Sequence, residues 1–118
     1  MGFRVDFAPQ ALRDLSDIAD YIKKRGSLES AERWFNGIFA DIHSLDETPA
    51  RCRVANASAE AGMEIRLLLH GRRNRQYKVY FTIDARQKTV HVLHVRHWAR
   101  RPLSGEEWAE KLREDLND

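Results

Sequence analysis

The sequence predicts an α+β domain in which an N-terminal strand leads into a two-helix antiparallel hairpin, packed on a mostly antiparallel four-stranded sheet and followed by a C-terminal helix. Two observations predict it. The spacing of apolar residues changes from period two to helical spacing and back again along the chain. Turn-forming residues separate these segments at short intervals, without a linker, repeat or low-complexity tract between them. With 118 residues, the chain is expected to form a single domain over residues 1–118.

The first half of the chain is expected to supply the first strand and the helical hairpin. Residues 3–7 alternate polar and apolar side chains, as a half-buried strand does. Pro9 then stands where the first turn of a helix tolerates proline, and apolar residues continue at helical spacing to Gly26. Ser27 is a candidate N-cap for a second helix, whose apolar stripe runs to Leu45. The short Gly–Ser turn predicts antiparallel helices whose apolar faces need a sheet to cover them.

Three more strands are expected in the second half, after a polar connection over residues 50–62 that is typical of a loop. Residues 63–70 and 76–84 alternate regularly and are separated by a turn with two cations at its tip. In residues 89–97 the apolar side chains change face part-way along the segment. This break in the alternation predicts a β-bulge, or a central strand that is covered on both sides.

The C-terminal segment is expected to form an acidic helix. Ser104 and Glu107 have the spacing of a capping box, in which each residue satisfies a backbone N–H group of the other. Trp108, Leu112 and Leu116 then form a narrow apolar stripe on an otherwise acidic segment. We expect this helix to cover part of the basic region that precedes it.

The charge of the chain is distributed unevenly, although the formal net charge is only +2. Residues 65–103 contain 10 Lys and Arg against one Asp, and the segments on either side are acidic. Such asymmetry is typical of a surface that meets an anionic partner, or of solvated strand faces and turns. Charge alone leaves both interpretations open.

Composition excludes several classes of protein. No apolar run reaches the ~20 residues that a membrane helix needs, and the first residues lack the apolar core of an export signal. We therefore expect a cytoplasmic protein with no membrane partner. Cys52 is the single cysteine, which excludes an internal disulfide and a cysteine-based metal site. The chain has no glycine-rich phosphate loop and no His residues with acidic ligands at matching spacing, so no metal, nucleotide or other cofactor is expected.

Several segments resemble the RelE/ParE superfamily of bacterial toxins. Residues 11–22 are similar to the first helix of ParE-type toxins, and the second helix, which runs to Leu45 and Pro49, is similar to theirs in length and pattern. The segments Ile65-Arg66-Leu67, Tyr77-Lys78-Val79-Tyr80 and residues 90–97 resemble the three strands that the superfamily shares. This resemblance implies the toxin of a type II toxin–antitoxin module of the plasmid-stabilisation type, which arrests growth and is closer to ParE in its helical hairpin.

Two mechanisms are known for the superfamily that the chain resembles. RelE-like members cleave messenger RNA in the ribosome without a metal, which requires a base, an acid and cations that hold the phosphate. If the chain is RelE-like, the resemblance implies a catalytic set of Arg66, Lys78, His97 and Arg100, and the alternation predicts that Arg66 and Lys78 point the same way. His94, Tyr80 and Glu64 are further candidates for the acid or base. Because His94 and His97 are three residues apart on a strand, we expect them on opposite faces unless the strand is irregular.

ParE-like members inhibit DNA gyrase, and this mechanism asks only for a stable hairpin and a charged face that meets a large partner. Both are visible in the sequence, so gyrase inhibition is narrowly favoured over ribosome-dependent cleavage of messenger RNA. A non-catalytic nucleic-acid-binding domain and an inactive homologue are further alternatives, and whether the chain is an enzyme stays open. The candidate residues for binding the target or a nucleic acid are Arg72, Arg73, Arg75, Tyr80, Arg96 and Arg101.

The resemblance also implies a cognate antitoxin that wraps the toxin with its C-terminal segment. The basic region suits an acidic disordered segment, and the sheet edges could accept an added strand. We therefore expect a tight antitoxin complex, with gyrase or the ribosome and its messenger RNA as the cellular target.

Overall fold

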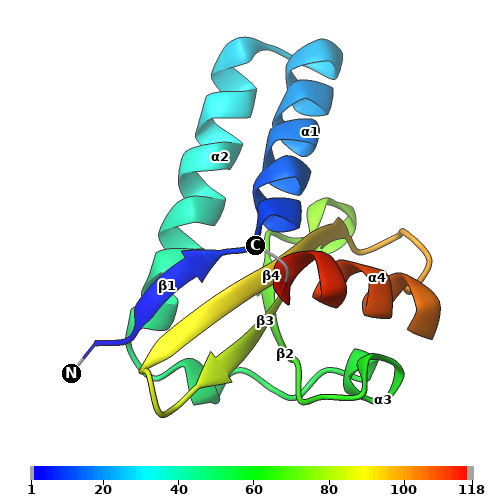
Figure 1. Ribbon diagram of the computed structural model, residues 1–118. Helices are drawn as coiled ribbons and strands as arrows, with labels where there is room; N and C mark the ends of the chain where they lie inside the picture. The colour runs from blue at the N-terminus through cyan, green and yellow to red at the C-terminus, as the bar shows by residue number, and fades with distance from the viewer. Residues whose placement is uncertain (1, 117–118) are drawn as a thin grey trace.

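The computed structural model describes residues 2–116 and confirms the predicted α+β architecture (Figure 1). Met1, Asn117 and Asp118 lie outside the described residues, as does the side chain of Leu116 that was expected on the apolar stripe of the last helix. The elements are β1 (Arg4–Phe7), α1 (Pro9–Arg25), α2 (Leu28–His43), η1 (Ser44–Asp46), η2 (Pro49–Arg51), α3 (Ala57–Ala61), β2 (Arg66–His70), η3 (Arg73–Arg75), β3 (Tyr77–Asp84), β4 (Thr89–His97) and α4 (Gly105–Leu116).

The sheet has the strand order β1-β4-β3-β2, with β1 parallel to β4 and the other pairs antiparallel. The predicted irregularity in β4 is a bulge at Leu93. Tyr80 pairs with His94 while the next residue, Phe81, pairs with Val92, so Leu93 is the extra residue on β4. Both explanations offered for the broken alternation therefore hold, because β4 is also a central strand with a core on each face.

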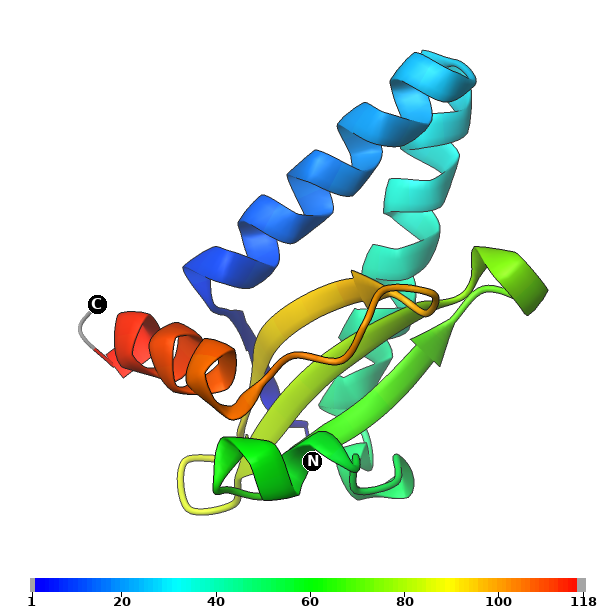
Figure 2. The ribbon, with the colours of Figure 1, turned by 90° about the vertical axis from the view of Figure 1, so that its right-hand side faces the viewer.

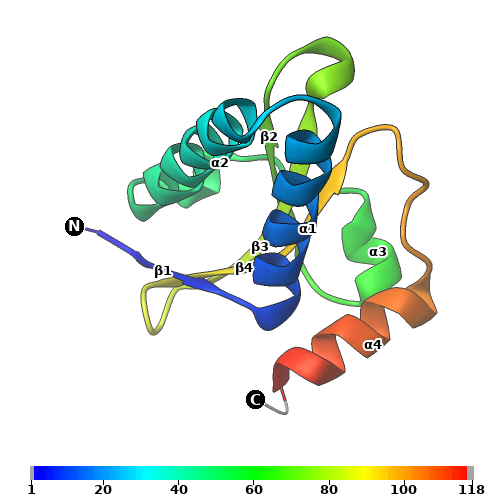
Figure 3. The same cartoon turned by 90° about the horizontal axis from the view of Figure 1, so that it is seen from above.

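Helices lie on both faces of the sheet (Figures 1 and 3), and a hydrophobic core is buried on each face. On one face, the hairpin of α1 and α2 buries Leu15, Ile38 and Ile42 against Val79 and Phe81. On the other face, α4 and the segment before it cover β2, β3 and β4. The buried residues of this second core are Ala55, Ile65, Leu67, Tyr80, Leu93, Leu103 and Trp108.

The connection over residues 50–62 is not the plain loop that the sequence predicts. It contains η2 and the five-residue helix α3, and Val54 forms a bridge with Arg66 beside the edge of β2. Ser58 explains why this polar segment is ordered, because its hydroxyl accepts a hydrogen bond from the Ile65 N–H and donates one to the Ile65 carbonyl. Composition alone does not show such long-range pairing. Strand β2 consequently begins at Arg66, later than predicted.

Both predicted helix caps are present. The Ser27 hydroxyl accepts a hydrogen bond from the Ser30 N–H at 3.0 Å and starts α2. The Glu107 N–H donates to the Ser104 hydroxyl at 3.1 Å, and the Ser104 N–H donates to the Glu107 carboxylate at 3.0 Å. This reciprocal pair is the capping box that the sequence predicts for α4.

Each helix of the hairpin is tied to the sheet by a histidine–aspartate pair. Asp14 of α1 lies 2.5 Å from Nδ1 of His94 on β4 and accepts a second hydrogen bond from the Val95 N–H. Asp41 of α2 lies 2.6 Å from Nδ1 of His70 on β2. The hairpin extends well beyond the sheet on the side of its turn (Figure 2). Both ties therefore lie towards the base of the hairpin, near the start of α1 and the end of α2.

Candidate functional site

Arg66 and Lys78 lie on opposite faces of the sheet, so the prediction that they point the same way is wrong. Arg66 pairs with Phe81, which belongs to the core under the hairpin, whereas Lys78 pairs with Leu69 and with Arg96. Residues paired directly across two strands share a face. The sequence pattern gave the alternation within each strand correctly, but the relative register of β2 and β3 decides which residues share a face.

The guanidinium group of Arg66 is occupied by the loop that precedes β2. It donates hydrogen bonds to the carbonyl oxygens of Cys52 at 2.6 Å and Ala50 at 3.2 Å, and Glu64 approaches it at 3.4 Å. These bonds satisfy carbonyl groups of an otherwise irregular segment. Arg66 therefore holds the connection after η2 in place, and its side chain is only 20% exposed.

His97 at the end of β4 has both ring nitrogens engaged by backbone groups. Nδ1 accepts a hydrogen bond from the Ala99 N–H at 3.1 Å, so the ring hydrogen is on Nε2, which donates to the Asn74 carbonyl at 2.8 Å. The ring also packs edge-on against Tyr77 at 5.2 Å. A histidine held in this way fixes the turn after β4 against the β2–β3 connection. Each ring nitrogen therefore has a backbone partner within the protein.

His94 lies on the opposite face from His97, as the spacing predicts, because it pairs with Tyr80 while His97 pairs with Tyr77. It is buried between the ring of Tyr80 and the edge of Trp108, and its Nε2 has no hydrogen-bond partner among the described residues. Tyr80, a predicted binding residue, is also buried under α4, and burial raises the pKa of its hydroxyl. Both residues therefore belong to the second core.

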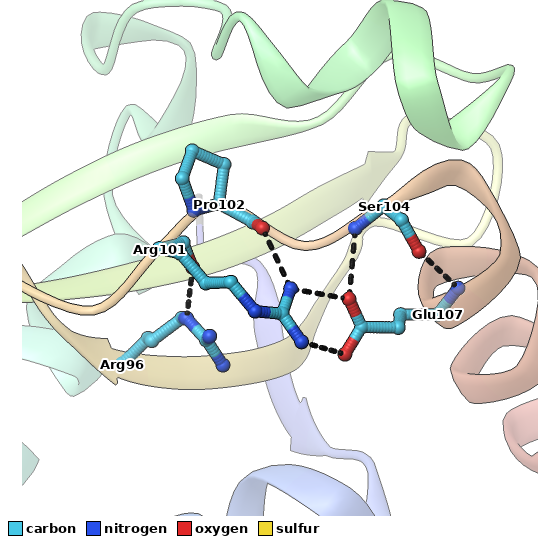
Figure 4. A network of polar contacts seen from close by, with 5 residues as sticks. All are labelled: Arg96, Arg101, Pro102, Ser104 and Glu107. Carbon is cyan, nitrogen blue, oxygen red and sulfur yellow. Dashed lines mark hydrogen bonds and ion pairs between the residues drawn. The ribbon is translucent and has the colours of Figure 1, made fainter.

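The basic region and the acidic helix meet in a network that joins β4 to α4 (Figure 4). Arg96 donates from Nε to the Arg101 carbonyl at 2.9 Å. Arg101 in turn donates to the two carboxylate oxygens of Glu107 at 2.7 and 3.2 Å and to the Pro102 carbonyl at 3.2 Å. Burial, together with the neighbouring charges of Arg100 and Arg101, lowers the pKa of Arg96. The acidic helix thus neutralises part of the basic region, as the sequence predicts.

The Arg101–Glu107 contact is expected to persist in acid. Hydrogen bonds from Arg101 and from the Ser104 N–H to the Glu107 carboxylate lower the pKa of Glu107 from 4.5 to about 2. A carboxylate with a lowered folded-state pKa keeps its contact above the unfolded-state pKa and loses it only as the pH falls through the folded-state value. Titration of the Glu107 side chain by NMR should give a midpoint near 2, and Arg101→Gln should move that midpoint towards 4.5. A midpoint already near 4.5 in the unchanged protein would contradict the contact.

The cations of the β2–β3 connection lie on a tight turn that needs Gly71. Its φ of +94° is unfavourable for other residues, and a Cβ there would meet the Arg75 carbonyl oxygen at 2.3 Å. The Arg75 N–H closes the turn by donating to the Arg72 carbonyl at 3.0 Å. Arg72, Arg73 and Arg75 are all exposed on this turn, which connects β2 to β3.

A groove of about 1130 Å³ separates this end of the sheet from the outer half of the hairpin. It brings Arg75 and Arg100, which are candidate residues from the sequence, close to Arg25 and Arg33 of the hairpin. Arg25 and Arg33 carry no signal in the sequence, because they belong to a segment with net negative charge and only the tertiary fold places them opposite the basic region. Among the described residues, no group of three or more His, Cys, Asp or Glu could hold a metal ion. No helix in the described part of the chain has the length and hydropathy to cross a membrane.

Comparison with known proteins identifies the family of the chain and structures with the same fold. The sequence model of the ParE toxin of the type II toxin–antitoxin system parDE matches residues 5–102. A search of curated proteins gives no match. Among solved structures, a chain of the chromosomal ParDE system from P. aeruginosa is 18% identical with a TM-score of 0.65, over 80% of this chain and 95% of that one.

Two further structures extend the comparison. A chain of the RelBE2 toxin–antitoxin complex from Mycobacterium tuberculosis is 20% identical with a TM-score of 0.57, over 85% of this chain and 95% of that one. A mutant of the E. coli toxin RelE in its free state is 13% identical with a TM-score of 0.54, over 99% and 97% of the two chains. At these identities the structural similarity establishes the shared fold.

Proposed function

Because the chain belongs to the ParE toxin family of type II toxin–antitoxin systems, we propose that it arrests bacterial growth by binding and inhibiting DNA gyrase and that it does not cleave RNA. The toxin role follows from the family. The choice of gyrase over the ribosome rests on the geometry of the residues that a ribonuclease would need.

The single observation that carries this choice is the state of His97. A metal-free ribonuclease needs a group that takes the proton of the 2′-hydroxyl and another that protonates the leaving oxygen. Both nitrogens of His97 are already hydrogen-bonded to the backbone, and His94 is buried under α4. Arg66 is occupied by loop carbonyls on the far face from Lys78. His97 and Arg100 line the same groove, but Arg66 and Lys78 lie on opposite faces of the sheet, so the four residues do not form one site.

The hairpin offers a surface that suits a protein target. Its tip projects beyond the sheet (Figure 2), and Tyr21 and Leu28 are 57% and 56% exposed there. Lys23, Lys24 and Arg25 add three exposed cations in the last turn of α1. Apolar anchors surrounded by charge are typical of protein–protein contact surfaces.

One observation favours the alternative of a RelE-like ribonuclease. Lys78 and Arg96 are paired directly across β3 and β4, on the sheet face that also bears the 41% exposed Leu69, the partner of Lys78 on β2. Two adjacent cations could hold a phosphate there. The alternative would then need a proton donor and acceptor other than His97.

We also propose that a cognate antitoxin neutralises the chain. The described part of the basic region leaves Arg72, Arg73, Arg75 and Arg100 exposed, which would attract an acidic segment. The antitoxin is expected to copurify with the chain at moderate salt when the two are expressed together. Loss of the complex under those conditions would contradict this part of the proposal.

The test induces the chain in bacteria without its partner and measures translation and plasmid supercoiling in parallel. We expect plasmid supercoiling to fall while messenger RNAs stay intact and translation continues. With purified gyrase, we expect the chain to lower the supercoiling activity of the enzyme. The double variant Lys24→Glu, Leu28→Ala should need roughly tenfold more toxin for half-inhibition, because it alters the exposed hairpin tip. Arg86→Glu, at the exposed β3–β4 turn, is the matched charge control and should behave as the unchanged chain. Early translation arrest with cleaved messages would establish the ribonuclease alternative.

A further inference from the structure

The groove between the hairpin and the end of the sheet has the composition of a ligand site. One wall comes from the outer halves of α1 and α2 and the other from the ends of the β2–β3 connection and β4. Its volume of about 1130 Å³ lies slightly above the range usual for small-molecule sites, and its lining combines aromatic side chains with arginines and other polar residues. These segments are far apart in the sequence, so no local sequence motif predicts the site.

The groove carries an excess of positive charge that the protein itself does not neutralise. Among the described residues, Arg25, Arg75 and Arg100 form no ion pair, and Arg33 has only a loose contact with Glu29 at 3.6 Å on the exposed rim. Asp17 is the one acidic side chain in the lining. Four guanidinium groups around one groove present paired N–H donors in the geometry that phosphate oxygens accept.

The inner surface of the groove is aromatic. The Trp34 ring packs against Tyr77 at 5.2 Å, Tyr77 packs against His97, and Tyr21 lies at the rim with the Arg25 guanidinium 5.4 Å from its ring centre. The Trp34 indole N–H is buried and has no acceptor among the described residues. The exposed part of the aromatic lining is therefore the Tyr21 ring at the rim, which is 57% exposed.

We infer that this groove binds a free nucleoside di- or triphosphate, with the base against the aromatic side chains and the phosphates between the arginines of the two walls. A flat heteroaromatic base provides a surface that can stack on the aromatic side chains of the lining. Three arginines without ion pairs match two or more phosphate charges better than a single carboxylate. The ligand would join the hairpin to the sheet end and so hold the outer half of the hairpin in place.

Isothermal titration calorimetry of the purified full-length chain tests the inference. ATP and GTP are the probes, in a buffer that contains EDTA. We expect micromolar dissociation constants, and at least tenfold weaker binding of both adenosine and inorganic tripolyphosphate. The double variant Arg75→Gln, Arg100→Gln should weaken nucleotide binding at least thirtyfold, since each lost charge-assisted contact typically costs a factor of about ten. Arg86→Gln, which removes an exposed arginine outside the groove, should leave the affinity unchanged.

A second variant separates stacking from charge. Tyr21→Ala removes an exposed ring without opening the core, so it should weaken ATP binding several-fold and leave the weak binding of tripolyphosphate unchanged. Three results would each overturn the inference: absence of ATP and GTP binding, tripolyphosphate binding equal to that of ATP, or equal losses in the Arg86→Gln control. Tighter binding of a single-stranded oligonucleotide without terminal phosphates would also overturn it, because the groove would then belong to a polymer.

Discussion

Trp108→Ala is expected to lower the free energy of unfolding by about 4 kcal/mol, the usual cost of deleting a fully buried large aromatic side chain. Trp108 is 1% exposed and closes the core on the second face of the sheet. Its ring meets Tyr80 edge-on at 5.3 Å and His94 at 6.0 Å. Because α4 is short and otherwise polar, few apolar side chains remain to hold it, and we expect the helix to separate from the sheet.

Urea unfolding followed by circular dichroism measures this change. Trp98→Ala is the matched control, because Trp98 is 43% exposed and its loss should cost less than about 1 kcal/mol. The near-ultraviolet circular dichroism and the protection of the Tyr80 amide against hydrogen exchange should fall in Trp108→Ala alone. Equal destabilisation by the two substitutions would show that α4 does not close a core.

Asp14→Ala is expected to cost about 3 kcal/mol, because it leaves two buried donors without an acceptor. The Asp14 carboxylate lies 2.5 Å from His94 Nδ1, and it accepts a 2.9 Å hydrogen bond from the Val95 N–H. Its side chain is 12% exposed and that of His94 4%. No other acidic group of the described residues contacts His94, so water would have to enter between α1 and β4 to replace the carboxylate.

Asp20→Ala provides the control for helix α1. Asp20 is exposed on the same helix, and its replacement should change the free energy of unfolding by less than about 0.5 kcal/mol. Asp14→Asn keeps the shape and one acceptor oxygen, so an intermediate loss is expected. If Asp14→Ala were as stable as Asp20→Ala, the carboxylate would not hold α1 to the sheet.

The order and type of the main elements could be predicted because each has a strong local signal. Ser27, Gly26 and the capping box at Ser104 mark helix ends through backbone chemistry that acts within a few residues. The broken alternation around Leu93 identified a bulged, central strand before any partner strand was known. Helix α3 and the bridge at Val54 had no such signal, because they depend on pairing with β2.

The candidate site was less predictable, since faces and partners depend on register and on distant segments. Arg66 and Lys78 looked equivalent along the sequence, yet the pairing of β2 with β3 places them on opposite faces. The two backbone groups that bind the His97 ring, the Asn74 carbonyl and the Ala99 N–H, likewise depend on the tertiary fold and could not be placed from the sequence. Arg25 and Arg33 enter the groove only because the hairpin passes over the end of the sheet.

The two histidine–aspartate pairs attach the hairpin to the sheet at one end and leave its other end projecting. Both attachments, Asp14 to His94 and Asp41 to His70, lie at its base, and its turn stands clear of the sheet (Figure 2). Amide hydrogen exchange should therefore accelerate steadily from the base to the turn. The hairpin and the last helix also share a contact residue, because His94 meets Asp14 of α1 and its ring lies 6.0 Å from the Trp108 ring of α4. A replacement of His94 is therefore expected to weaken the attachment of both elements, although they lie on opposite faces of the sheet.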